Sequence, residues 1–223
     1  MIDHEAMCCR ALDEIKRVLA LKRKDGVPFV NHFLFLMSVL HNQHRGTKGA
    51  GLTGGLEREK VWIEMLEAGS RNFRRKPPVD ASPPRDYDYY WESYPLSHKT
   101  IGWSGNGDLA LAWSKNPAGG VQRKDFESSI VIVNSHRNTR RGNWAKVGMG
   151  VYLIPVPVLI ERVTLKSNNK SDSIIGSDDV RACLRHAQDI GLYHAFTFNP
   201  EQGRSRYFSM WHASHDAIRE QDH

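Results

Sequence analysis

The sequence lacks the features that mark secreted, membrane-spanning and disulfide-stabilised proteins. It holds only three cysteines among 223 residues, and the adjacent pair Cys8 and Cys9 makes a poor basis for a disulfide framework. No apolar run approaches the roughly 18 residues that a membrane-spanning helix needs. The first residues are acidic and amphipathic, without the basic and apolar regions of a secretory signal. We therefore expect a cytoplasmic protein with reduced thiols and no membrane partner.

Several motifs that would identify an enzyme class are missing as well. The chain contains no CxxC pair, and no Gly-Lys-Ser/Thr completes a phosphate-binding loop. Residues 49–54 match the GxGxxG spacing, but a helix is predicted before them, whereas the dinucleotide fingerprint needs a strand there. We interpret residues 45–55 as a glycine-rich loop. The pair His41 and His44 has no nearby Cys, Asp or Glu to complete a zinc site.

Hydrophobic periodicity predicts helices in the first part of the chain. Apolar residues recur at three- and four-residue spacing over residues 3–24, where Asp3 is the expected N-cap. Further helices are expected over 28–44 and 56–68. Prolines and charges then concentrate in a stretch that favours neither helix nor strand. We therefore divide the chain into a helical subdomain, a proline- and arginine-rich join and a mainly β domain, at residues 1–70, 71–86 and 87–223.

The remainder of the chain has the alternation of strands and turns. Residues 98–103 and 108–113 are expected to form a hairpin across Ser104–Gly107. Two strands broken by Pro155 and Pro157 should lie at an edge or bulge, because proline cannot donate to a strand ladder. A short helix over 178–190, capped by Ser177, and a final hairpin complete the prediction. The fold class is α+β: a helical N-terminal segment, then an antiparallel or mixed β-sheet with one further short helix.

Positive charge concentrates in one part of this β domain. The chain carries a net charge of +6, and residues 128–170 hold seven basic residues against one acid, Glu161. Such a patch focuses potential on an anionic partner, and nucleic acid is the commonest one. We interpret this stretch as a basic hairpin whose arginines grip phosphates and whose aromatic faces stack on bases. The alternative is a solvated hairpin tip. The candidate nucleic-acid-binding residues are His136, Arg137, Arg140, Arg141, Trp144 and Lys146.

One acid in the β domain suggests metal-dependent phosphodiester chemistry. Asp108 is placed at the start of a predicted strand, and Lys115 follows it. This arrangement resembles the PD-(D/E)xK nucleases, in which carboxylates bind Mg²⁺ and a lysine steadies the attacking water. The sequence departs from that plan at Trp113, where the second acid should stand. Glu92 or Glu127 would have to supply it. The alternative for Asp108 is an ordinary hairpin-end residue satisfied by turn amides.

Two His-x-Thr/Ser triplets suggest a different, metal-free chemistry. His98-Lys99-Thr100 and His212-Ala213-Ser214 each lie at a predicted strand end. The pair resembles the signature of the 2H phosphoesterases, in which two histidines exchange protons across a phosphodiester. The resemblance covers only these triplets.

We therefore predict a nucleic-acid-acting enzyme, a Mg²⁺-dependent endonuclease that hydrolyses phosphodiester bonds, with DNA rather than RNA as partner. Asp108 and Glu127 or Glu92 would hold the metal ion, and Lys115 would orient the water. A non-enzymatic DNA- or RNA-binding module using the basic hairpin is the first alternative. The two-histidine phosphoesterase is the second. The sequence leaves a homodimer open.

Overall fold

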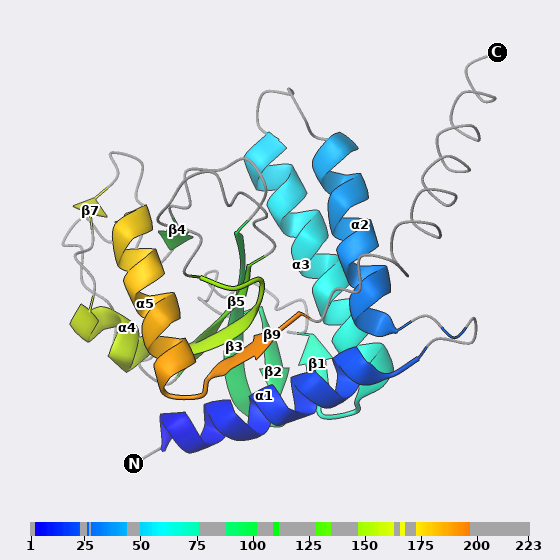
Figure 1. The fold of residues 1–223 in the computed structure, drawn as a ribbon, viewed down its shortest axis with the longest axis horizontal. Helices are drawn as coiled ribbons and strands as arrows, with labels where there is room; N and C mark the ends of the chain where they lie inside the picture. The colour runs from blue at the N-terminus through cyan, green and yellow to red at the C-terminus, as the bar shows by residue number, and fades with distance from the viewer. Residues whose placement is uncertain are drawn as a thin grey trace, which may run out of the picture.

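The computed structural model describes the chain in ten ranges (Figure 1), which are residues 3–22, 26, 28–43, 50–75, 88–101, 109–111, 128–134, 147–162, 166–167 and 173–196. Within them the protein is an α+β fold with five helices and two sheets. The elements are α1 (His4–Ala20), α2 (Phe29–Gln43), α3 (Ala50–Gly69), β1 (Phe73–Arg75), β2 (Tyr89–Trp91), β3 (Tyr94–Ile101), β4 (Leu109–Leu111), β5 (Ser129–Asn134), β6 (Gly150–Pro155), α4 (Val156–Arg162), β7 (Lys166–Ser167), β8 (Ser173–Ile175), α5 (Ser177–Asp189) and β9 (Tyr193–Ala195). The predicted fold class is confirmed.

The three N-terminal helices form where the apolar periodicity predicted them. Asp3 caps α1, because its carboxylate accepts a hydrogen bond from the Ala6 amide at 3.0 Å. The third helix corrects the prediction of a glycine-rich loop, since α3 already begins at Ala50 and includes Gly51, Gly54 and Gly55. A glycine in a helix costs only about 1 kcal/mol relative to alanine. Extending an existing helix adds one hydrogen bond per residue, so the glycines do not end it.

The larger sheet has the strand order β1-β2-β3-β5-β6-β9. β1, β2 and β3 form an antiparallel meander, β5 runs parallel to β3, and β6 and β9 continue antiparallel. The predicted hairpin between residues 98–103 and 108–113 is wrong. β3 pairs with β2 and β5, whereas β4 pairs with β8 in a separate sheet of order β4-β8-β7. The tight hairpin lies instead at Glu92 and Ser93, where Glu92 has a φ of 53°.

The proline-containing stretch also differs from its prediction. β6 ends at Pro155, and the chain turns at once into α4, where Pro157 is the second residue. Proline is tolerated in the first turn of a helix because the amides there have no intrahelical acceptor. β6 pairs with β5 on one side and β9 on the other, so it is not an edge strand. The helix predicted over 178–190 is confirmed as α5, with Gly176 rather than Ser177 at the N-cap position.

Helices cover the sheet from two sides (Figure 1). α2 and α3 lie on one side and α4 and α5 on the other, while α1 runs across the end where β9 lies. α1 is held to β5 by a hydrogen bond between Cys8 Sγ and Ser129 Oγ at 3.1 Å. The side chains buried by these layers form one cluster that includes Trp62, Tyr89 and Tyr152. This cluster draws on residues before and after the predicted join, and the division into subdomains stays a prediction.

No helix among the described residues is long and apolar enough to cross a membrane.

Candidate active site

The topology brings several chain segments to one edge of the six-stranded sheet. β3 and β5 are parallel, so both end at this edge, at Ile101 and Asn134. β2 is antiparallel to β3, so its start points toward the same end of the sheet, but Tyr89 pairs with Leu96, which places Asp88 beside Ser97, four residues short of Ile101. In an open sheet the carboxyl ends of parallel strands are the usual location of a ligand site. The polar side chains along β2 and β3 are therefore the first candidates for such a site.

Asp88 is the acid that the strand pairing fixes most firmly, beside the middle of β3. Its Oδ2 accepts hydrogen bonds from the His98 amide at 2.5 Å and from Ser97 Oγ at 3.1 Å. Its Oδ1 makes no hydrogen bond within the described residues. Lys99 lies two residues beyond Ser97 on β3 and therefore projects from the same face of the strand. The two strands thus combine an anchored carboxylate with a lysine.

A second acid, Glu59 of α3, interacts electrostatically with this pair. Burial and, as the lesser cause, the negative charge of Asp88 raise the pKa of Glu59 to about 7, against the opposing effect of Lys99 and Arg75. The Glu59 side chain is half-buried. Glu59 belongs to α3, which packs on the His98 face of β3, whereas Lys99 projects from the opposite face, so the three groups are linked by their charges and not by a described contact.

His98 is buried on the face of β3 that α3 covers. Only 3% of the residue is accessible to solvent, and its ring stacks on Trp62 with the centroids 5.5 Å apart. Its Nε2 lies 2.9 Å from Thr100 Oγ1. Burial, together with the positive charges of Lys99 and Arg58, lowers the pKa of His98 to about 3. A ring so placed is poorly suited to proton transfer at neutral pH, and the two-histidine hypothesis stays a prediction.

The buried ring gives a prediction for stability against pH. The unfolded chain protonates His98 near its ordinary value of 6.5, whereas the folded chain does so only near 3. The folded state therefore loses stability as the pH falls below about 6.5. As the pH falls below about 6.5, the wild type should lose stability relative to His98→Phe, which has no group to protonate at this position. The difference in unfolding free energy should grow by up to ~1.4 kcal/mol for each pH unit of this decrease.

Urea unfolding of both proteins at several values between about pH 7.5 and about pH 5 measures this difference. The other titrating groups are common to both proteins, so their contributions cancel in the comparison. A difference that stayed constant over the window would show that His98 is protonated alike in the folded and unfolded chains.

Glu92, one of the acids predicted to bind a metal ion, lies away from this edge. It occupies the β2–β3 turn, at the end of β2 opposite Asp88. Its carboxylate is 3.5 Å from the Arg10 guanidinium, which in turn lies 5.1 Å from the centroid of the Trp91 ring. The described contacts of Glu92 are those of a surface ion pair on a tight turn.

The other predicted site residues lie outside the described residues, and their roles stay predictions. They are Asp108, Lys115, Glu127, His212, His136, Arg137, Arg140, Arg141, Trp144 and Lys146. The described strands nevertheless locate where two of their segments join the sheet. The segment with Asp108 follows Ile101, and the segment with the three arginines follows Asn134, so both leave from the edge where β3 and β5 end. Within the described ranges, no three His, Cys, Asp or Glu side chains converge to hold a metal ion.

Sequence reasoning missed the three residues that the structure associates through their charges, Glu59, Asp88 and Lys99. The available signal was an acid directly before an aromatic strand, with a lysine at alternate spacing on the next strand. That pattern is common in a chain of this composition. It becomes informative only when the two strands are known to pair.

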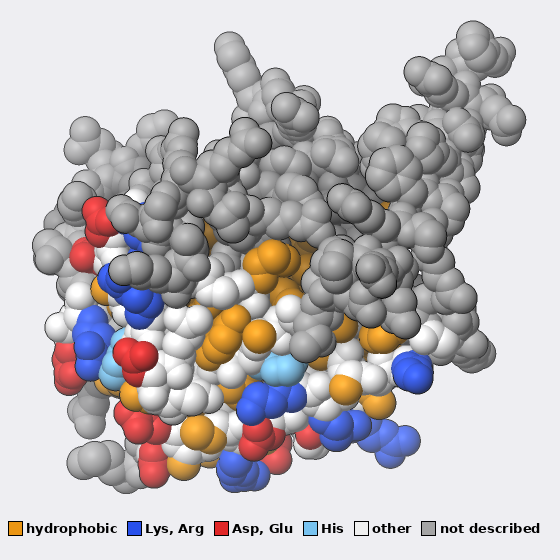
Figure 2. Space-filling model, viewed as in Figure 1, with side chains coloured by type: hydrophobic (Ala, Val, Ile, Leu, Met, Phe, Trp, Pro, Cys, Tyr) orange, Lys and Arg blue, Asp and Glu red, His pale blue; other side chains and the backbone are white. Residues whose placement is uncertain are grey.

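The described surface over α1 and α5 carries charged side chains of both signs. On the face shown in Figure 2, basic and acidic side chains are interspersed rather than segregated. The described part of this face therefore lacks the single-sign patch that a polyanion needs.

Comparisons with known proteins give one structural likeness and no sequence match. No family model matches the chain, and no curated protein matches it either. A solved structure described as a restriction endonuclease in complex with substrate DNA aligns with 81% of this chain and 83% of its own, at 15% sequence identity and a TM-score of 0.44. The chain is similar to that protein at this level, which assigns it to no family.

Proposed function

We propose that the protein is a metal-dependent endonuclease that hydrolyses phosphodiester bonds of nucleic acid, with DNA preferred over RNA. The observation that supports this best is the carboxylate of Asp88, which two hydrogen bonds fix beside Ser97 and His98 on β3, with Lys99 on the same face of that strand as Ser97 and Glu59 acting on both through its charge. Two acids and a lysine are the groups that metal-assisted hydrolysis of a phosphodiester requires. The basic segment that follows Asn134 begins level with Ile101, two residues beyond Lys99, which would bring its arginines within reach of the substrate backbone.

The proposal keeps the reaction predicted from the sequence but favours different residues. Asp88 takes the place first given to Asp108, and Lys99 the place given to Lys115. Ser97 stands two residues before Lys99, where the resembling nucleases have their second acid, and Glu59 supplies that acid from α3 instead. Asp108 remains a further candidate, because its segment follows the end of β3.

The described acids fit a hard divalent cation such as Mg²⁺. This ion binds through one or two protein carboxylates, and water and substrate phosphate complete its octahedron. Asp88 offers its Oδ1, since Oδ2 is occupied by Ser97 and His98, and the Glu59 carboxyl would lose its repulsion from Asp88. When bound, the ion would neutralise charge on the phosphodiester and favour ionisation of a water molecule.

The protein groups then have separate roles. Asp88 is fixed by two hydrogen bonds, so it is held in one orientation without reorganisation during the reaction. The positive charge of Lys99 would lie beside the nucleophilic water or a non-bridging phosphate oxygen. Water attacks phosphorus, one phosphorus–oxygen ester bond breaks, and the strand ends as a phosphate and a hydroxyl. The buried pair of His98 and Trp62 supports β3 from behind and keeps Lys99 in register.

Incubation of the full chain with plasmid DNA and with single-stranded RNA, with Mg²⁺ or with EDTA, tests the proposal. We expect cleavage of the plasmid only with Mg²⁺, and its loss in Lys99→Gln, which removes the charge at similar length. A gel shift without turnover under any metal would reject the enzyme and leave the binding module. Hydrolysis that resists EDTA and disappears in His212→Ala would instead support the metal-free phosphoesterase.

A further inference from the structure

The two edge strands of the six-stranded sheet differ in how they are protected from pairing with another strand. β1, at one edge, carries the exposed residues Arg74 and Arg75. The Glu92 amide donates to the Asn72 carbonyl, and hydrogen-bonded pairs alternate along an antiparallel ladder, so the Arg75 amide points away from β2. That amide donates instead to Glu67 Oε1 of α3 at 2.6 Å. Charged side chains and a covered amide make β1 a protected edge.

β9, at the other edge, has outward-facing backbone groups without such cover. The Leu153 amide of β6 donates to the Leu192 carbonyl just before β9. By the same alternation, the amides and carbonyls of Tyr193 and Ala195 point away from β6. These four groups have no hydrogen-bond partner among the described residues. They are available to a further strand.

The β9 edge is also accessible and carries no Lys, Arg, Asp or Glu. Ala195 is exposed, whereas Tyr193 and His194 are half-buried. Ile190, shortly before β9, is a large apolar residue that is 37% exposed. Hydrophobic side chains gather in Figure 2 between α1 and α5, where Figure 1 has β9. An exposed, uncharged edge strand with free backbone groups is the kind that pairs with another chain.

The charges beside this edge favour a second copy of the chain over nucleic acid. Burial and, as the lesser cause, the charge of Lys16 lower the pKa of His194, so Lys16 of α1 lies near β9. Lys16 in turn pairs with Asp13 at 2.8 Å, and both signs are interspersed over α1 and α5 (Figure 2). The acids would repel a polyanion. A surface that carries both signs is instead suited to its own copy turned about a two-fold axis.

We propose that two copies of this chain pair through their β9 strands, antiparallel to each other, about a two-fold axis at His194. Tyr193 of each copy would exchange backbone hydrogen bonds with Ala195 of the other. The two six-stranded sheets would become one continuous sheet, and the neighbouring surfaces of α1 and α5 would enlarge the interface. Asp88 precedes β2, which is far from β9 in the strand order. The inference therefore does not rest on the proposed function.

Sedimentation equilibrium of the full chain, without nucleic acid, tests the pairing. We expect the wild type to have twice the mass of one chain at micromolar concentrations. Ala195→Pro removes the outward amide but no hydrogen bond to β6, and proline is tolerated on edge strands at such positions. It should raise the dissociation constant about tenfold to a hundredfold, because the symmetry removes two hydrogen bonds. Ala195→Ser keeps the amide and should pair as the wild type does.

Cross-linking tests the register of the pairing. A Cys9→Ser background removes the exposed thiol of the described chain. In this background, His194→Cys should form a disulfide between two copies under mild oxidation. The Cβ atoms of directly opposed residues lie about 4.5–5.5 Å apart, and small shifts bring them within reach of a disulfide. Arg74→Cys, exposed on the protected edge β1, should remain a single chain on a non-reducing gel.

Several results would overturn the inference. A wild type that stays a monomer at every concentration, or a dimer without the cross-link at position 194, would show that β9 does not pair as proposed. A dimer as tight in Ala195→Pro as in Ala195→Ser would show that the copies meet elsewhere. Circular dichroism verifies the fold of each variant, and the cross-link remains decisive if Ala195→Pro does not fold. Slow hydrogen exchange of the Tyr193 and Ala195 amides in a monomer would show that another segment of the same chain covers the edge.

Discussion

Replacement of Asp88 by asparagine is expected to reduce Mg²⁺-dependent cleavage of DNA by at least ~100-fold, the scale of losing a preorganised group that stabilises charge. Asparagine can still accept the hydrogen bonds of Ser97 and the His98 amide, so the strand start should keep its geometry. It cannot supply the negative charge that a divalent cation requires. Initial cleavage rates on plasmid DNA, with circular dichroism to verify the fold, measure the effect.

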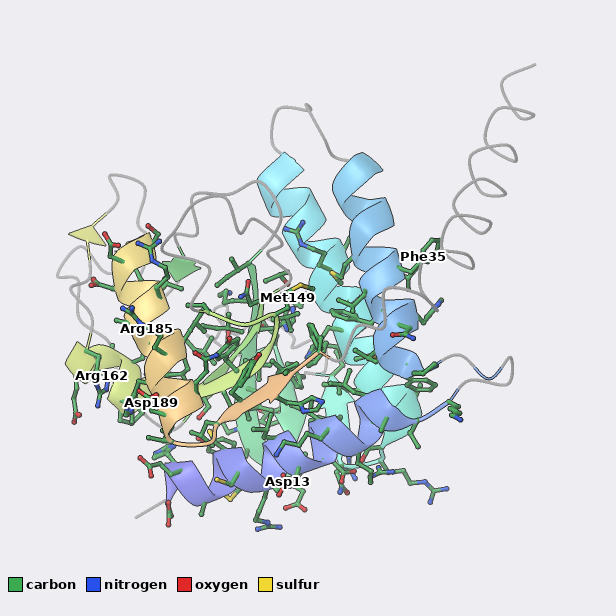
Figure 3. The ribbon with its side chains drawn as sticks, viewed as in Figure 1. Asp13, Phe35, Met149, Arg162, Arg185 and Asp189 are labelled. Atoms are coloured by element: carbon green, nitrogen blue, oxygen red, sulfur yellow. The ribbon has the colours of Figure 1, made fainter. Side chains whose placement is uncertain are left out.

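Asp13→Asn is the matched control for this substitution. Asp13 is exposed on α1 (Figure 3) and pairs with Lys16 at 2.8 Å, so its loss should leave the cleavage rate within about twofold and the stability within ~0.5 kcal/mol. Asp108→Asn provides the competing test. If Asp88→Asn cleaves normally while Asp108→Asn does not, the site predicted from the sequence is correct and the one assembled around Asp88 is not.

Truncation of Trp62 to alanine should give the largest loss of stability. Trp62 is fully buried and packs edge-on against Phe33 at 5.1 Å between centroids. It also stacks on His98 and donates a hydrogen bond from Nε1 to the Tyr89 hydroxyl at 3.0 Å. We expect the unfolding free energy to fall by about 3–5 kcal/mol, because a cavity opens in the core. The buried Tyr89 hydroxyl also loses its donor.

Chemical denaturation of two further variants separates these contributions. Trp62→Phe keeps most of the ring packing and loses the hydrogen bond, so it should be only about 1–3 kcal/mol less stable than the wild type. Ile190→Ala removes a large apolar side chain that is 37% exposed, and we expect it to change stability by less than ~0.5 kcal/mol. A loss for Trp62→Ala no larger than that for Ile190→Ala would mean that α3 does not pack on β3 as the structure has it.

The two sets of variants also connect the core to the proposed chemistry. Trp62 supports His98, and the backbone amide of His98 holds Asp88. On warming, Trp62→Ala should therefore lose its cleavage activity at temperatures well below its own Tm. Asp88→Asn should lack cleavage activity at every temperature. This contrast distinguishes a group that acts in the reaction from one that only positions it.

Local signals in the sequence were sufficient to predict α1, α2 and α5. Asp3 caps α1 through its own side chain, and the apolar face of that helix repeats every three or four residues. Signals of this kind involve neighbours within one or two turns, so a single segment contains them. The predictions that were wrong concern features that a single segment does not contain. Proline at positions 155 and 157 indicates a break in a strand, but it does not say that a helix follows or that β6 has partners on both sides.

The sequence by itself determined that this is an α+β protein with helices first, and that positive charge concentrates in residues 128–170. The tertiary structure alone decided which strands pair, and with that the location of the candidate site. Asp88, Lys99 and Glu59 come from three elements, and no spacing along the chain relates them. Their placement follows from β2 running antiparallel to β3, which sets Asp88 beside Ser97, and from Trp62 packing α3 against His98, on the face of β3 opposite Lys99. Such contacts are set by the burial of distant side chains in one core, which no local pattern specifies.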